Sequence, residues 1–236
     1  MNVLVIGSGG REHAIVEAIS RSSKATKIYA APGNAGIAQL AECVAIKDTE
    51  VEKLLEFAKA NAIDLTVVGP EAALAVGVVD AFREAGLKIF GPTTAAAEIE
   101  ARKDFAKRLM VKYDVPTAAY ATFSDFDEAL AYVKKGSLPT VLKYDGLAAG
   151  KGVVIATTME EAEATLRDML LDTRFGKGSV VIEEFLTGEE FSLMCFVAGN
   201  KNCVMPVAQD HKRACDSDEG PNTGGVGAYA ALPFLS

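Results

Sequence analysis

The sequence is poor in the residues that build metal centres and redox pairs. It contains two histidines, His13 and His211, and four cysteines, of which no two have the spacing of a CxxC pair. A multi-histidine metal centre and a CxxC metal or redox motif are therefore excluded. Four free thiols in a chain of 236 residues are typical of a reducing compartment, so we expect the cytoplasm.

Long apolar runs and an excess of basic charge are also absent. No apolar stretch approaches the ~18 residues of a membrane span, and the first residues, MNVLVIGSGG, lack the basic leader of a signal peptide. With 24 basic and 32 acidic residues, the formal net charge is −8. This balance argues against nucleic-acid or membrane partners, while it leaves room for a local site that binds a phosphorylated metabolite.

The first ninety residues alternate short apolar runs with helical patterns. Buried parallel strands are expected at residues 3–6, 27–31, 43–46, 65–69 and 88–91, because each of these runs is apolar and most of them end near a glycine. Helical spacing follows at 51–58, where Thr49 and Glu52 predict a capping box. The alternation predicts a doubly wound α/β sheet that binds ligands at the carboxyl ends of its strands.

After Pro92 the pattern changes. We expect helices over 95–113, 125–134 and 159–171, a β-hairpin over 139–156, and strands over 179–185, 191–198 and 203–208. Thr158 and Glu161 predict a capping box for the third of these helices. Strands that follow one another without helices predict an antiparallel sheet in a second domain of α+β type.

The GSGG turn at Gly7 contains only part of a dinucleotide fingerprint. Glu12 stands where G-x-G-x-x-G requires its third glycine, and no acidic residue follows the second strand to hold a ribose. NAD binding is therefore disfavoured. Backbone N–H groups at a helix N-terminus, with Arg11 beside them, favour a single phosphate. The alternative is a turn that needs glycine for packing alone.

Acidic residues follow two other strands. The carboxylate of Glu71, after the fourth strand, suits the vicinal hydroxyls of a ribose, although an acid at a helix N-terminus is the alternative. The strand that runs into Glu183–Leu186 can offer backbone groups to an adenine edge, with Phe185 and Leu186 as apolar walls. Glu190 can take ribose hydroxyls. The alternative is a strand with a solvated acidic end.

The glycine-rich centre of the expected hairpin is not a Walker A loop. Three residues rather than four separate Gly146 from Gly150, and Lys151 is followed by Gly152 rather than by serine or threonine. Glycine allows close backbone approach, and Lys143 and Lys151 supply positive charge, so the segment predicts a loop folded over a polyphosphate. A solvated turn is the alternative.

The end of the chain carries two further motifs. His211 can act as a general base or contact a phosphate, although a solvated histidine is the alternative. The PNTGG segment at Pro221 reads as a turn that offers amides to a small anion.

Taken in order, these motifs resemble those of the phosphoribosylamine–glycine ligases of the ATP-grasp superfamily. The resemblance rests on GSGGREHA, APGNAG, VGPE, IFGPT, DGLAAGKGV, VIEEFLTGEE, QDHKR and GPNTGGVGAY, and reaches about Tyr229. It implies ligation of glycine to 5-phosphoribosylamine in purine biosynthesis, driven by ATP through a glycyl phosphate. It also implies a Rossmann-like substrate-binding domain over 1–100 and an ATP-grasp domain over 101–236. Within the second, 116–187 would be the ATP-lid subdomain and 188–236 the start of the core.

The resemblance assigns a role to each matching residue. The catalytic residues would be Lys143, Lys103 and Arg213. The ATP-binding residues would be Lys103, Lys143, Gly146, Gly150, Lys151, Gly152, Glu183, Glu184, Phe185, Leu186 and Glu190. The substrate-binding residues would be Gly9, Gly10, Arg11, Asn34, Glu71, Asp210, His211, Lys212, Arg213, Asn222, Thr223 and Gly224. Magnesium is implied as well, with ligands beyond the end of this chain, so we expect a part of the enzyme that is inactive alone.

Two positions depart from the family pattern, and two other functions stay open. Tyr144 stands where a small residue is usual, and Val226 stands where methionine is usual. One alternative is another ATP-grasp carboxylate–amine ligase, such as a carboxyaminoimidazole synthetase, or a biotin carboxylase; DHKR and GPNTGG argue against it. The other is a non-catalytic nucleotide-binding module.

Overall fold

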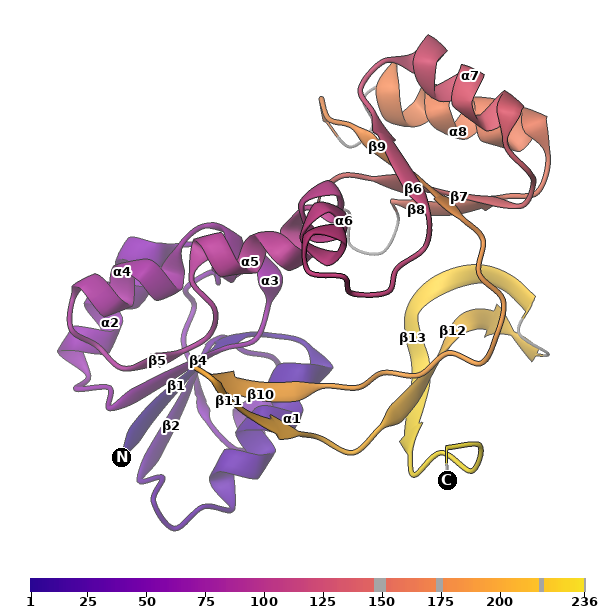
Figure 1. Ribbon diagram of the computed structural model, residues 1–236. Helices are drawn as coiled ribbons and strands as arrows, with labels where there is room; N and C mark the ends of the chain where they lie inside the picture. Colours follow the sequence, from indigo (N-terminus) through magenta and orange to yellow (C-terminus); the bar gives the residue numbers. More distant parts are fainter. Residues whose placement is uncertain (147–151, 173–175, 217–218, 236) are drawn as a thin grey trace. The chain divides into compact units, whose positions relative to one another are not determined.

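The chain forms two compact units, Met1–Tyr113 and Asp114–Ser236, each of which is described by itself. The computed structural model describes residues 1–146, 152–172, 176–216 and 219–235 (Figure 1). No helix in these parts is long and apolar enough to cross a membrane.

The first unit is built on a sheet of five parallel strands in the order β3-β2-β1-β4-β5. The strands are β1 (Asn2–Gly7), β2 (Lys27–Pro32), β3 (Glu42–Cys43), β4 (Leu65–Val68) and β5 (Ile89–Phe90). The order reverses at β1, since β2 pairs with one of its edges and β4 with the other. The predicted doubly wound α/β sheet is confirmed.

Helices cover both faces of this sheet (Figure 1). Alternate β1 side chains point to opposite faces, so Val5 packs with α1 (Gly10–Ser20) and η1 (Ile37–Gln39). Leu4 and Ile6 pack on the other face with α2 (Val51–Ala60), α3 (Glu71–Ala75) and α4 (Val78–Glu84). This two-sided burial explains why the strands are apolar at almost every position.

The predicted single helix over 95–113 is wrong, because the segment forms two helices. They are α5 (Thr94–Ala101) and α6 (Lys103–Lys112), and the backbone of Arg102 between them is extended, with φ −132° and ψ 110°. No glycine or proline marks this break in the sequence. The carboxylate of Asp80 accepts hydrogen bonds from the amide, at 2.8 Å, and the hydroxyl of Thr94, which fixes the start of α5.

One predicted capping box is wrong and the other is half correct. Helix α2 begins after Glu50, whose carboxylate accepts from the Lys47 amide at 2.9 Å, and it has no side-chain cap. At α8 (Met159–Leu170) the Thr158 hydroxyl accepts from the Glu161 amide at 3.2 Å, as predicted. The Glu161 carboxylate, however, accepts mainly from the amide and the hydroxyl of Thr157, at 2.8 Å each.

The second unit begins with an antiparallel sheet of four strands in the order β6-β9-β7-β8. The strands are β6 (Tyr120–Phe123), β7 (Thr140–Tyr144), β8 (Val153–Ala156) and β9 (Val180–Glu184). Helices α7 (Phe126–Lys135) and α8 (Met159–Leu170) pack on one face through a shared apolar core (Figure 1). The predicted hairpin is β7–β8, and the predicted α+β character is confirmed.

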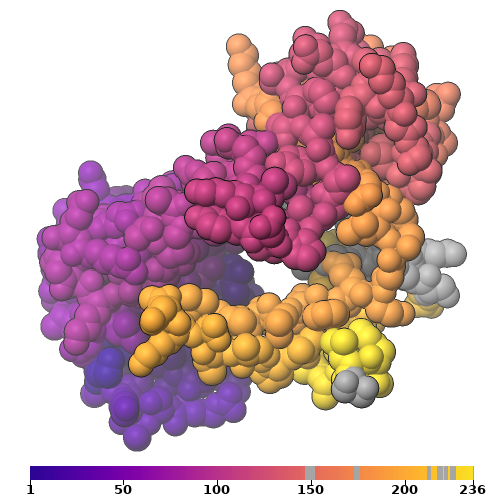
Figure 2. Space-filling view, viewed as in Figure 1, coloured from indigo at the N-terminus to yellow at the C-terminus, as the bar shows by residue number. Residues whose placement is uncertain are grey.

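Two further hairpins complete the second unit. Strand β10 (Cys195–Ala198) pairs with β11 (Lys201–Val204), and β12 (Ala208–Cys215) pairs with β13 (Glu219–Ala230). The side chains of Phe196, Val197 and Val204 in the first hairpin are exposed. Figure 2 shows the segment of this hairpin in orange. The turn predicted at Pro221 is wrong, since this segment lies within β13. Asn222 is in register with Arg213, and the pairing is irregular between this pair and the pair of Gly227 with His211.

Candidate functional site

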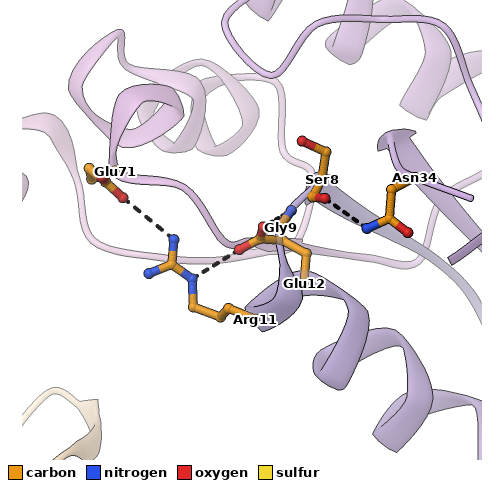
Figure 3. Close-up of polar contacts among 6 residues, drawn as sticks. All are labelled: Ser8, Gly9, Arg11, Glu12, Asn34 and Glu71. Atoms are coloured by element: carbon orange, nitrogen blue, oxygen red, sulfur yellow. Dashed lines mark hydrogen bonds and ion pairs between the residues drawn. The ribbon is translucent and has the colours of Figure 1, made fainter. Parts of the chain in front are cut away.

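Three loops meet at the carboxyl edge of the parallel sheet in the first unit. The Gly33 amide donates to the carbonyl of Gly7 at 3.1 Å, and the Gly69 amide donates to the carbonyl of Ile6 at 3.0 Å. Asn34 joins the first two loops, because its Nδ2 donates to the carbonyl of Ser8 at 2.7 Å (Figure 3). Its Oδ1 accepts from the Ile37 amide at 2.9 Å. Both ends of this predicted substrate-binding side chain therefore hold the loops in place.

Glu12 fills the space that a third glycine would leave open. Its side chain is 4% exposed and folds back beneath the turn, where Oε2 accepts from the Gly9 amide at 2.6 Å. A Cβ atom at Gly7 would lie 2.5 Å from Glu12 Cγ, and one at Gly69 would lie 2.1 Å from Oε1. The glycines are thus required by a carboxylate of the chain itself, which already engages the Gly9 amide.

Arg11 lies between two carboxylates (Figure 3). Its Nε donates to Glu12 Oε1 at 2.9 Å, and its Nη2 lies 3.4 Å from Glu71 Oε2. Burial disfavours the guanidinium charge, but the hydrogen bonds and charges of Glu12 and Glu71 outweigh it, so the pKa of Arg11 is raised. The trio carries a net charge of −1, with Arg11 and Glu71 exposed enough to reach a ligand.

A second group of predicted residues lies on the face of the antiparallel sheet that points away from α7 and α8. Leu142 and Ile182 point toward the helices, so Lys143 and Glu183 point to the opposite face. Lys143 Nζ lies 2.9 Å from Glu183 Oε1, with side chains 28% and 6% exposed. This is a diagonal pair on neighbouring strands, since Lys143 is in register with Val181.

The glycine segment that was predicted to cover a polyphosphate begins and ends beside this pair. The Tyr144 amide donates to the carbonyl of Gly152 at 2.8 Å, which closes the base of the hairpin. The Tyr144 ring leaves no room for a Cβ at Gly146, which would lie 2.8 Å from it. Gly150 and Lys151 lie outside the described residues.

The segment after β9, predicted to hold an adenine, is partly engaged in the fold. The amide of Glu184 donates to the carbonyl of Ala119 at 3.0 Å, and the Glu184 carboxylate accepts from the Ala119 amide at 2.8 Å. Phe185 and Leu186 are 38% and 64% exposed. Their apolar surface is therefore available to a flat ligand.

The remaining predicted residues belong to α6 and to the last hairpin. Lys103 is the first residue of α6, in the first unit, whereas Lys143 belongs to the second. Gly10 is the first residue of α1. Strand β12 carries Asp210, His211, Lys212 and Arg213, and β13 carries Asn222, Thr223 and Gly224. Arg213 is in register with Asn222.

Sequence reasoning missed a connection on this hairpin. Gln209 Nε2 donates to the carbonyl of Glu190 at 2.9 Å, and Gln209 Oε1 accepts from the Tyr229 hydroxyl. The rings of Tyr229 and His211 are stacked, with centroids 5.7 Å apart and planes 20° apart. No signal in the sequence gives this contact, because it depends on the strand register. The role of Glu12 was missed too, because the sequence was compared only with a dinucleotide fingerprint. An acid at the third position of a helix is a signal for a side chain that caps the helix N-terminus.

Among the described residues, no three or more of the histidine, cysteine, aspartate and glutamate side chains gather as a metal site. No magnesium ligand is assigned to these residues.

Comparison with known families covers both units. Residues 1–100 match the N domain of phosphoribosylglycinamide synthetase, and residues 101–236 match its ATP-grasp (A) domain. A phosphoribosylamine–glycine ligase of Streptococcus pneumoniae is 58% identical over 100% of the chain, which covers 57% of that protein. The chain thus spans just over half the length of the curated relatives it matches.

Solved structures show the same fold. The crystal structure of a phosphoribosylamine–glycine ligase from Thermotoga maritima matches with a TM-score of 0.83 and 35% identity, over 99% of this chain and 57% of that one. An N5-carboxyaminoimidazole synthetase from Staphylococcus aureus, complexed with ADP, matches with a TM-score of 0.69 and 14% identity, over 90% and 55%. The second likeness concerns the fold alone.

Proposed function

Because the chain belongs to the phosphoribosylglycinamide synthetase family, we propose that it supplies substrate- and nucleotide-binding parts for the ATP-dependent ligation of glycine to 5-phosphoribosylamine. In this reaction the glycine carboxylate takes the γ-phosphoryl group of ATP and releases ADP. The amine of phosphoribosylamine then attacks the glycyl carbonyl, phosphate leaves, and a C–N bond forms.

The ion pair of Lys143 and Glu183 is the observation that carries the nucleotide part of the proposal. Phosphoryl transfer depends mainly on positioning and charge neutralisation, and a lysine held by a buried carboxylate presents its charge from a fixed place. Lys103, Gly146, Gly152 and Glu190 would contact the nucleotide from their own elements, as would Gly150 and Lys151. The exposed faces of Phe185 and Leu186 would hold the adenine.

The carboxyl edge of the parallel sheet would bind phosphoribosylamine. Glu71 would accept from the ribose hydroxyls, while Gly10 and Arg11 would face the phosphate. Gly9 and Asn34 would act by shaping the turns, because their polar groups already bind the chain. Strands β12 and β13 would contribute the remaining substrate residues and the proposed catalytic Arg213.

Magnesium would neutralise phosphate charge when bound with ATP. The described residues offer no cluster of ligands for it, so no step here is assigned to the metal. Cys43, Cys195, Cys203 and Cys215 are free and exposed, which supports the proposal of a reducing cytoplasm.

Binding and turnover together test the proposal. Calorimetry of the chain with ATP and with ribose 5-phosphate should detect one site for each. ADP release is then measured with phosphoribosylamine and magnesium, in the presence of glycine or of bicarbonate, on the chain and on a longer relative. Stimulation by bicarbonate instead of glycine would favour a different ATP-grasp ligase. ATP binding in both proteins without glycine-dependent ADP release would favour a binding module.

A further inference from the structure

The side chains of Gln209 and Tyr229 connect the backbone at Glu190 to the ring of His211. The first link is the 2.9 Å hydrogen bond from Gln209 Nε2 to the Glu190 carbonyl. The second is the hydrogen bond from the Tyr229 hydroxyl to Gln209 Oε1, and the third is the stacking of Tyr229 on His211. We call Gln209 and Tyr229 the amide–phenol bridge.

The strand register explains why the bridge reaches His211. Gln209 is directly opposite Tyr229, and His211 lies two residues further along β12, on the same face as Gln209. The residue opposite His211 is Gly227, where an added Cβ would meet nothing within 4 Å. Because this cross-strand position carries no side chain, the phenol ring of Tyr229 is free to lean toward the imidazole.

The bridge uses both ends of one amide. Gln209 accepts through Oε1 and donates through Nε2, so it cannot turn over without breaking both hydrogen bonds. Ser192 also pairs with Ala208 by hydrogen bonds of 2.7 and 3.1 Å, which holds the segment after Glu190 beside the start of β12. These hydrogen bonds form a short, continuous path from the Glu190 backbone to the hairpin.

We infer that Gln209 and Tyr229 are positioning residues that fix the His211 ring and couple it to the segment at Glu190. The inference rests on the proposed function, in which Glu190 belongs to the nucleotide site and His211 to the substrate site. Binding of a nucleotide at Glu190 then changes the orientation of His211. The bridge acts through His211 and touches no reacting atom.

The His211 ring can be observed directly by NMR, since the chain has only one other histidine. A His13→Gln variant identifies the two sets of imidazole signals. Without any nucleotide, Tyr229→Leu removes the stacked ring and should shift the His211 ring protons, whereas Tyr229→Phe keeps the ring and should leave them nearly in place. Unchanged His211 signals in Tyr229→Leu would overturn the positioning role, whatever the nucleotide does.

The coupling is tested by titration with ADP and magnesium. In the wild-type chain, ADP should shift the His211 signals. Gln209→Glu still accepts from Tyr229 but cannot donate to the Glu190 carbonyl, so it should keep the stacking and lose the ADP-induced shift. Tyr229→Phe, which lacks the hydroxyl, should lose that shift as well.

Calorimetry with ADP on the same samples separates the two ideas. If ADP does not bind the wild-type chain, the proposed nucleotide site fails, while the comparison of Tyr229→Leu with Tyr229→Phe still decides the positioning role. If ADP binds but the His211 signals stay still, or if they move equally in Gln209→Glu, the coupling is refuted.

Discussion

Replacing Lys143 by alanine should weaken ATP binding and destabilise the second unit for two different reasons. In the folded chain, Lys143 Nζ lies 2.9 Å from the carboxylate of Glu183, which is only 6% exposed. The substitution removes the positive charge proposed to contact a phosphate. It also leaves the buried carboxylate without this partner.

The structure allows both magnitudes to be worked out. A hydrogen bond to a charged group contributes about 1.5–3 kcal/mol, and about 1.4 kcal/mol corresponds to tenfold in affinity. We therefore expect the Kd for ATP to rise about 10- to 100-fold. Breaking a fully buried pair costs about 3–5 kcal/mol, but Lys143 is 28% exposed, so we expect a loss of folding free energy of roughly 1–3 kcal/mol.

A double variant separates the two effects. Lys143→Ala with Glu183→Gln removes the uncompensated charge, so the free energy of unfolding should recover in part, while the affinity for ATP should stay low. Lys134→Ala is the matched control, because this lysine lies on the exposed side of α7. Urea denaturation gives the stability and calorimetry gives the Kd.

An affinity for ATP that returns together with stability in the double variant would refute the phosphate role of Lys143. In that case the ion pair would be structural. An unchanged Kd in the single variant, with the Lys134→Ala control also unchanged, would lead to the same conclusion.

Three further predictions concern the first unit. Ribose 5-phosphate should raise its melting temperature and NAD at the same concentration should not, because Glu12 occupies the turn; stabilisation by NAD would contradict this reading. Glu12→Gln cannot accept hydrogen bonds from both the Gly9 amide and the Arg11 guanidinium as a carboxylate does, so it should lose about 1–3 kcal/mol of stability and weaken ribose 5-phosphate binding. The control Glu17→Gln should leave the melting temperature unaltered. An unaltered melting temperature in Glu12→Gln as well would show that the buried hydrogen bonds contribute nothing to stability. The side-chain and amide hydrogen bonds of Thr94 lower the pKa of Asp80 in the folded chain from its ordinary 3.8. The contribution of Asp80 to the free energy of unfolding is therefore complete above pH 3.8 and is lost as the pH falls through the lowered pKa of the folded state. Asp80→Asn should therefore destabilise at pH 7, and its difference from wild type should shrink in denaturation curves measured below about pH 4; a difference that does not change with pH would contradict this assignment.

The parallel sheet could be predicted because its signals are local. Strand β1 is apolar at nearly every position, which is typical of a parallel sheet covered on both faces, and it ends in a glycine that marks the turn. The break at Arg102 could not be predicted in the same way. Its backbone is extended, with φ −132° and ψ 110°, in a segment that holds no glycine or proline to signal the break.

The candidate site could be predicted only to the level of loops. Glycine turns and nearby acids predict which loops lie at the carboxyl edge of the sheet, but not which of their polar groups already bind other parts of the chain. The Glu12 carboxylate accepts a hydrogen bond from the Gly9 amide, and the Asn34 side chain both donates and accepts one. These contacts depend on how closely the three loops approach one another, which the sequence does not give. The PNTGG segment is predicted as a turn because its residue types favour turns, whereas in the structure it belongs to β13 and is paired with β12 through Asn222.

The buried carboxylate of Glu12 acts as a ligand that the chain carries with it. It lies three residues along the chain from the Gly9 amide, from which it accepts a hydrogen bond. Its effective concentration at that amide therefore far exceeds that of any dissolved metabolite. The turn is thereby held in shape before a substrate arrives, and binding need not supply the entropy of ordering it. A ligand anion could bind the Gly9 amide only by displacing the Glu12 carboxylate. If this edge of the sheet binds the substrate as proposed, part of its selectivity is already present in the protein without ligand.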